Sequence, residues 1–66
     1  MASIRELLAW GSRELSSLER PAHEAAILLS AECGLSKEAL YARLTDEVAE
    51  RFATKFRHSI ALRKEG

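Results

Sequence analysis

The sequence is poor in the residues that cross-link or interrupt a small protein. Its 66 residues include one cysteine, one proline and three glycines. A single cysteine excludes an internal disulfide, and so few glycines and prolines leave long stretches free to form helices. No N-terminal apolar run is long enough for a secretion signal or a membrane span. We therefore expect a cytoplasmic protein that makes no contact with a membrane.

Motifs for catalysis and for cofactor binding are also missing. The sequence has no glycine-rich phosphate loop, no nucleophile beside a base and no paired carboxylates in a catalytic setting. His23 and Cys33 are the nearest approach to a metal-ligand pair, and no second pair stands at ligand spacing. We therefore expect no catalytic residue, no cofactor and no metal site within these residues.

Net charge of either sign is lacking overall, but the charges are unevenly spread. Residues 1–50 hold five Lys/Arg against nine Asp/Glu, and residues 51–66 hold five against one, so balances of −4 and +4 cancel to the net charge of zero. A neutral total argues against general nucleic-acid binding. The C-terminal segment is the basic end of the chain.

The composition is that of a folded helical domain. Hydrophobic residues make up 47% and charged residues 30% of the chain, as in ordinary globular proteins. Apolar residues recur every three or four positions, and nothing alternates with the period of two that a strand requires. We predict a single all-α domain over residues 1–66, a small orthogonal or antiparallel bundle of four to five helices.

The segment from Pro21 to Gly34 is predicted to be the central helix. Proline at a first helical position loses no hydrogen bond, Glu24 suits the positive end of the helix dipole, and Gly34 fits a left-handed position after the helix. Apolar residues lie on several sides, with one face made of Ala22, Ala25, Ala26, Leu29 and Cys33. Such a helix must be covered by several neighbours.

A first helix is predicted over residues 4–15. Ser3 is placed to cap it, and Glu6 stands at the position that completes a capping box. Gly11 falls inside the apolar stripe, where it weakens the helix but lets another backbone come close. Trp10 lies toward the edge of the stripe and is expected to half-cover the core.

Two further helices are predicted after Gly34. Ser36 is expected to cap a short helix that ends near Leu44, and Thr45 is expected to start a long last helix. An apolar residue recurs there every four positions, at Val48, Phe52, Phe56 and Ile60. Glu47 and Arg51 then form an i,i+4 ion pair. Across the chain, the expected core residues are Leu8, Ala25, Leu29, Leu40, Phe52 and Phe56.

One functional interpretation concerns residues 31–41. Their glycine turn, serine cap and Leu-Tyr pair are similar to the helix-turn-helix of TetR-like repressors, in which Ser36, Lys37 and Arg43 would face DNA. The acidic balance of residues 1–50 argues against this alternative, because phosphate binding needs a basic face.

A second interpretation uses nearly the whole chain. Four segments follow one another: I-R-E-L-L-A-W, P-A-H-E-A-A-I-L-L, C-G-L-S-K-E-A-L-Y-A-R and F-R-H-S-I-A-L-R-K-E-G. In this order and at these intervals they resemble the N-terminal domain of the HemK/PrmC family, the release-factor glutamine methyltransferases. The family usually has Asp-Ala-Glu before its paired leucines, whereas this chain has Glu24, Ala25 and Ala26. The segment between Leu44 and Glu50 is also shorter than in many relatives.

The resemblance implies a role in translation termination. The family transfers a methyl group from S-adenosylmethionine to the glutamine of the Gly-Gly-Gln motif in class I peptide release factors. Its cofactor-binding and catalytic motifs belong to a following domain, which we expect in the parent protein. The implied partners of this helical domain are therefore the release factor and its own catalytic domain.

Contact with such a partner is expected on the outer face of the last helix, at Arg51, Arg57, His58 and Lys64. Charged residues on a solvated face usually contribute little by themselves, so their role depends on a partner. A self-associating helical bundle is the third function class left open by the sequence. We expect a monomer.

Overall fold

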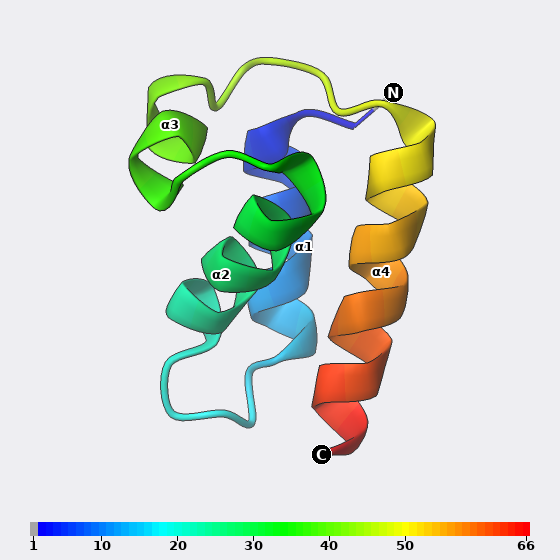
Figure 1. Cartoon of the computed structure of the whole chain (residues 1–66). Helices are drawn as coiled ribbons and strands as arrows, with labels where there is room; N and C mark the ends of the chain where they lie inside the picture. The colour runs from blue at the N-terminus through cyan, green and yellow to red at the C-terminus, as the bar shows by residue number, and fades with distance from the viewer. Residues whose placement is uncertain (1) are drawn as a thin grey trace.

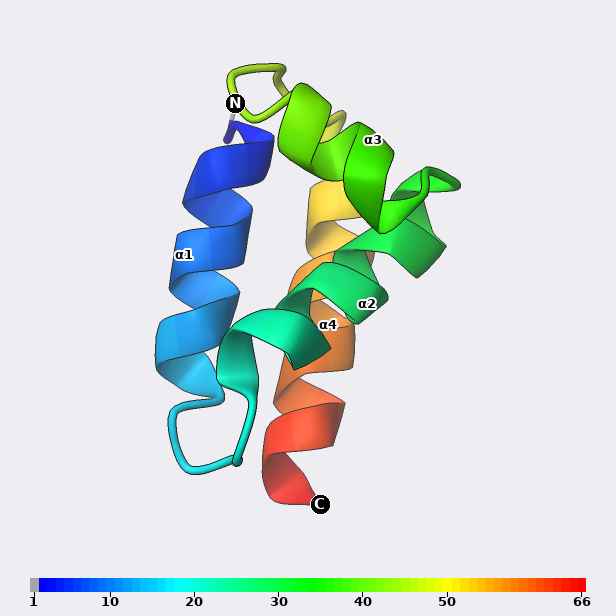
Figure 2. The same ribbon diagram turned by 90° about the vertical axis from the view of Figure 1, so that its left-hand side faces the viewer.

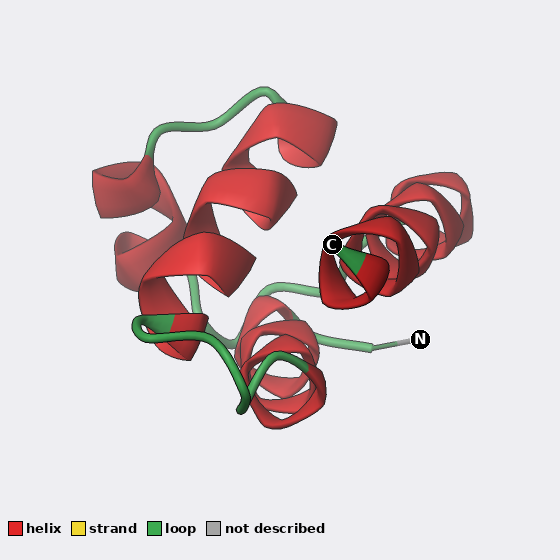
Figure 3. Cartoon of the chain, turned by 90° about the horizontal axis from the view of Figure 1, so that it is seen from below, coloured by secondary structure: helices red, strands yellow, loops and turns green. Residues whose placement is uncertain are grey.

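The computed structural model describes residues 2–66 and contains four helices in that range. They are α1 (Ile4–Glu14), α2 (Pro21–Cys33), α3 (Lys37–Ala42) and α4 (Glu50–Glu65). α1 and α4 run in the same direction, and α2 runs back against both of them at an incline (Figures 1 and 2). Seen from below, α1 and α4 are viewed nearly end-on and α2 lies across the view (Figure 3). No strand is present among the described residues, and the prediction of an all-α bundle is confirmed.

α2 is the central helix of the bundle, as its sequence predicts. It packs against α1, α3 and α4. Pro21 occupies the first helical position, and Gly34 ends the helix with a φ of 68°. The amides of Gly34 and Leu35 both donate to the Ser30 carbonyl, so the last turn is closed without a side-chain cap.

The hydrophobic core lies where α1, α2 and α4 meet. Of the predicted core residues, Ala25, Leu29, Leu40 and Phe56 are completely buried. Leu8 and Phe52 are half-buried and pack against the core from outside, which places them at its edge. The rest of the buried apolar set is Ile4, Leu7, Leu15, Ala26, Val48, Ala53 and Ile60.

Gly11 lies where α1 comes close to both α2 and α4. A Cβ atom added there would lie 3.0 Å from Phe56 Cζ, 3.1 Å from Ala25 Cβ and 3.2 Å from Ile60 Cδ1. The absence of a side chain therefore lets α1 settle against both α2 and α4. Beside it, the Trp10 ring meets Phe56 edge-on at 6.2 Å between centroids and half-covers the core, as expected.

The start of the last helix differs from its prediction. Thr45 was expected to begin it, but α4 begins at Glu50. Residues 43–46 form a turn, and residues 47–49 follow it as an extended connection to α4. Because Glu47 lies outside the helix, the predicted i,i+4 pair with Arg51 is wrong. Glu50 instead pairs with Arg57, at 3.3 Å.

The extended connection is held by the N-terminus of the chain. Ser3 and Glu47 form an isolated antiparallel bridge. On either side of it, the Ile4 amide donates to the Asp46 carbonyl and the Val48 amide donates to the Ala2 carbonyl, each at 2.9 Å. These hydrogen bonds join residues more than 40 positions apart. They keep this segment out of the helix that the spacing of its apolar residues predicts, and nothing in that spacing indicates them.

The same contact satisfies the first turn of α1. The amides at a helix start have no partner inside the helix. Here the Ile4 amide donates to the Asp46 carbonyl, and the Arg5 amide donates to the Leu44 carbonyl at 2.9 Å. The Ser3 hydroxyl accepts from the Glu6 amide, and the Glu6 carboxylate accepts from the Ser3 amide, which completes the predicted capping box.

Replacing Ser3 by alanine is expected to lower the unfolding free energy by about 1 kcal/mol, because the Glu6 amide loses its acceptor.

The backbone and side-chain hydrogen bonds from Ser3 hold the pKa of Glu6 below its ordinary value of 4.5. A lowered folded-state pKa stabilises the fold above the unfolded-state pKa, and this contribution is lost as the pH falls through the folded-state pKa. Thermal unfolding of Glu6→Gln should therefore differ from wild type near neutral pH and converge with it in strong acid. If the unfolding curves of the two proteins are equally far apart at neutral pH and in strong acid, the lowered pKa of Glu6 is contradicted.

Candidate functional site

The outer face of α4 carries a stripe of exposed side chains that the core does not use. Arg51, Lys55, His58 and Leu62 follow one another at i, i+4, i+7 and i+11, so they lie in one row along the helix. All four are exposed, and Leu62 keeps 58% of its surface accessible. We call these four residues the α4 stripe. It combines positive charge with one apolar side chain.

Two of the predicted contact residues belong to the stripe. The Arg51 guanidinium lies over the Phe52 ring, 4.8 Å from its centroid, which orients the cation while leaving it exposed. His58 is exposed and forms no side-chain hydrogen bond or ion pair with residues 2–66. Both side chains are therefore available to a partner.

The other two predicted contact residues are engaged within the bundle. Arg57 pairs with Glu50 at 3.3 Å, and Lys64 pairs with Glu14 of α1 at 3.1 Å. Exposed pairs of this kind are worth about 0–1 kcal/mol each, so they orient the side chains more than they stabilise the fold. The structure thus separates these two residues from Arg51 and His58.

Lys55 and Leu62 are the members of the stripe that the sequence interpretation omitted. Lys55 forms no ion pair with the described residues. Both could have been found by continuing the three- and four-residue spacing from Arg51 along the helix. That spacing identifies a face, but only the packing shows which face remains uncovered.

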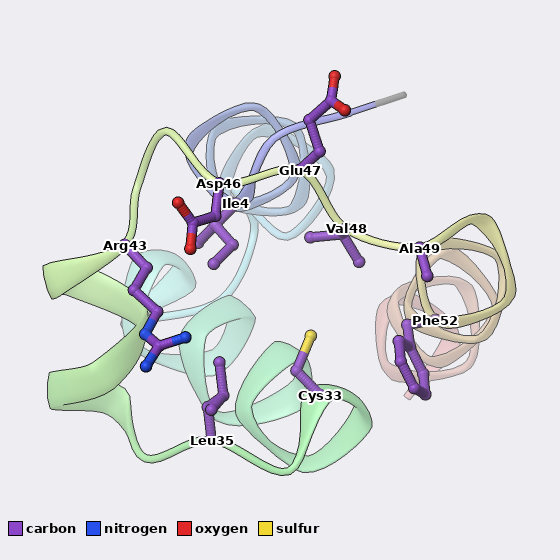
Figure 4. Close-up of a pocket in the computed structure, with 9 residues that line it drawn as sticks. All are labelled: Ile4, Cys33, Leu35, Arg43, Asp46, Glu47, Val48, Ala49 and Phe52. Atoms are coloured by element: carbon purple, nitrogen blue, oxygen red, sulfur yellow. The ribbon is translucent and has the colours of Figure 1, made fainter.

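A pocket of about 310 Å³ beside the start of α4 is a second candidate site (Figure 4). It lies between the end of α2, the end of α3 and the extended connection. Apolar side chains and one thiol form most of its wall: Ile4, Cys33, Leu35, Val48, Ala49 and Phe52. Charged residues, namely Arg43, Asp46 and Glu47, stand around it. The sequence interpretation did not predict this pocket, because its walls come from four separate parts of the chain.

Cys33 places its sulfur toward the centre of the pocket (Figure 4). Burial, followed by the charge of the neighbouring Glu32, raises the pKa of the Cys33 thiol above its ordinary value of 9.0. The thiol therefore stays protonated near neutral pH, which makes it a poor nucleophile and a weak metal ligand. Among residues 2–66, no group of three or more potential ligand side chains is placed to hold a metal ion.

The comparisons with known proteins test the family resemblance that the sequence suggests. The family model for the PrmC N-terminal domain matches residues 6–66, which is nearly the whole chain. The chain belongs to the PrmC N-terminal domain family. Searches of curated proteins and of solved structures give no match. The predicted resemblance to HemK/PrmC is confirmed at the level of this domain.

In this PrmC N-terminal domain, the two candidate sites differ in their side chains. The α4 stripe consists of Arg51, Lys55, His58 and Leu62, and the pocket is lined by apolar side chains, the Cys33 thiol and three charged residues. No helix formed by residues 2–66 is both long and apolar enough to cross a membrane.

Proposed function

We propose that this chain is a non-catalytic docking domain of a release-factor glutamine methyltransferase in the cytoplasm. The match of the PrmC N-terminal domain to residues 6–66 carries the proposal. In the parent enzyme, a separate catalytic domain would bind S-adenosylmethionine and methylate the Gly-Gly-Gln glutamine. The helical domain would help to hold the class I release factor in position.

The α4 stripe is the proposed contact surface for the release factor. Its cations are not neutralised by ion pairs with residues 2–66. They would attract an acidic region of the partner and set its orientation. Leu62, exposed at the C-terminal end of the row, would add an apolar contact once water is excluded.

The DNA-binding alternative remains a prediction that the structure does not favour. Lys37, which would have to face DNA, directs its Nζ atom to within 3.4 Å of His23 Nδ1. Its neighbour Glu38 is exposed in the first turn of the same short helix. A carboxylate at that position repels phosphate.

A charge-reversal experiment tests the docking proposal. Binding of the 66-residue chain to a class I release factor can be measured by isothermal titration calorimetry. Replacing Lys55 and His58 together by glutamate is expected to raise the Kd on the order of tenfold or more, because the stripe then repels an acidic partner. Arg5→Glu is the matched control, since Arg5 is an exposed cation of α1 outside the stripe. It should leave the Kd unchanged.

Two results would contradict the docking proposal. Equal Kd values for the double variant and the wild type would remove the stripe from the interface. No heat of binding to any class I release factor would remove the release factor as a partner of this domain. Sedimentation of the same samples should show a monomer, and an oligomer would support the self-associating bundle instead.

A further inference from the structure

We propose that the pocket beside α4 binds an extended peptide segment of a protein partner, with one apolar side chain in the pocket and an adjacent acidic side chain on Arg43. This site lies at the start of α4 and adjoins the α4 stripe, because the Arg51 guanidinium lies over the ring of Phe52, but it is lined by other residues. The inference therefore goes beyond the docking role proposed above and does not depend on it.

The pocket has an apolar lining and room for at least one apolar side chain. Its volume is about 310 Å³. Leu35, Val48 and Phe52 offer water few hydrogen-bond partners there. An entering leucine, methionine or phenylalanine would release poorly bound water and bury apolar surface on both partners.

The extended connection provides a backbone edge beside the pocket. In an antiparallel bridge flanked by two hydrogen bonds, the bridged residue itself directs its N–H and C=O to the opposite side. Glu47 is such a residue, because the flanking bonds are made by Asp46 and Val48. The Glu47 amide and carbonyl form no hydrogen bond with residues 2–66. An extended peptide can pair with such an edge and thereby present every second side chain to the pocket.

The charges around the pocket select the sequence of that peptide. Arg43 extends along Leu35, whereas the Glu47 carboxylate points away from the cavity (Figure 4). Arg43 is exposed and forms no ion pair among the described residues, although Asp46 is close in sequence. A peptide carboxylate next to the apolar anchor would give this guanidinium a bidentate partner. Asp46 would repel an acidic side chain of the peptide placed beside it. The acidic residue must therefore lie on the Arg43 side of the apolar anchor, which fixes the direction of the peptide.

Selection from a displayed library of random short peptides tests the proposal on the intact 66-residue chain. The enriched peptides should share an apolar residue beside an aspartate or glutamate. For the synthetic form of the strongest peptide, Arg43→Gln should raise the Kd on the order of tenfold or more. Arg13→Gln is the control, because Arg13 is an exposed cation in the last turn of α1. It should leave the Kd unchanged.

The single cysteine supplies an independent readout. Since the Cys33 sulfur faces the pocket (Figure 4), a bound peptide should slow its alkylation by iodoacetamide about tenfold when the site is about 90% occupied. A peptide whose apolar residue is replaced by serine should give no protection. Failure to enrich peptides, equal affinity for Arg43→Gln, or unprotected alkylation would each overturn the proposal.

Discussion

Replacing Leu29 by alanine is expected to lower the unfolding free energy of the domain by about 2–5 kcal/mol. Leu29 is completely buried in α2, the helix that packs against the other three. Truncation removes apolar burial and leaves a cavity that neighbouring helices can fill only in part. A domain of 66 residues has a total stability of roughly 3–10 kcal/mol, so this one change removes a large share of it.

Ile27→Ala is the matched control for this experiment. Ile27 lies two positions away on the same helix and leaves 44% of its surface exposed. Its truncation should cost about 1 kcal/mol or less, because little buried contact is lost. Urea unfolding followed by the fluorescence of Trp10 would measure both variants. Equal losses would show that α2 does not bury the face containing Leu29.

Replacing Gly11 by leucine is expected to destabilise the domain by about 3 kcal/mol or more. Even a single added carbon would approach Phe56, Ala25 and Ile60 within 3.0–3.2 Å. The further atoms of leucine would have to push α1 away from α2 and α4, and overpacking of this kind costs about 1–3 kcal/mol or more. The gain in helix propensity, about 1 kcal/mol relative to glycine, does not offset it.

Ala9→Leu separates the packing effect at Gly11 from helix propensity. Ala9 lies on the exposed side of α1, and alanine and leucine have similar helix propensities. This variant should unfold within about 0.5 kcal/mol of the wild type. Thermal and urea unfolding of the two leucine variants would settle the comparison. A Gly11→Leu variant as stable as Ala9→Leu would show that α1 is not held this close to its neighbours.

Helix starts and ends were predicted correctly where they depend on residues close together in the sequence. The capping box of Ser3 and Glu6, the proline at position 21 and the left-handed Gly34 were predicted and are present. Each depends on contacts within about four residues, which a sequence pattern records directly. The same holds for the period that identifies the apolar side of α4.

The candidate sites could be predicted only in part. The outer face of α4 follows from helical spacing, so Arg51 and His58 were assigned to it. Arg57 and Lys64 were assigned there as well, although they pair with Glu50 and Glu14. Lys64 and its partner are 50 positions apart in the chain. Which cations remain available to a partner therefore depends on contacts that spacing along one helix does not describe.

The sequence by itself determined the all-α class, the central role of α2 and the membership in the PrmC N-terminal domain family, because these rest on local patterns and on motif order. Only the tertiary structure decided where α4 begins, which cations stay unpaired and that a pocket exists. The unpaired cations are those left over once Arg57 pairs with Glu50 and Lys64 pairs with Glu14. Backbone hydrogen bonds with residues 2–5 hold residues 44–48 outside the helix, and that long-range contact shapes both the start of α4 and the wall of the pocket.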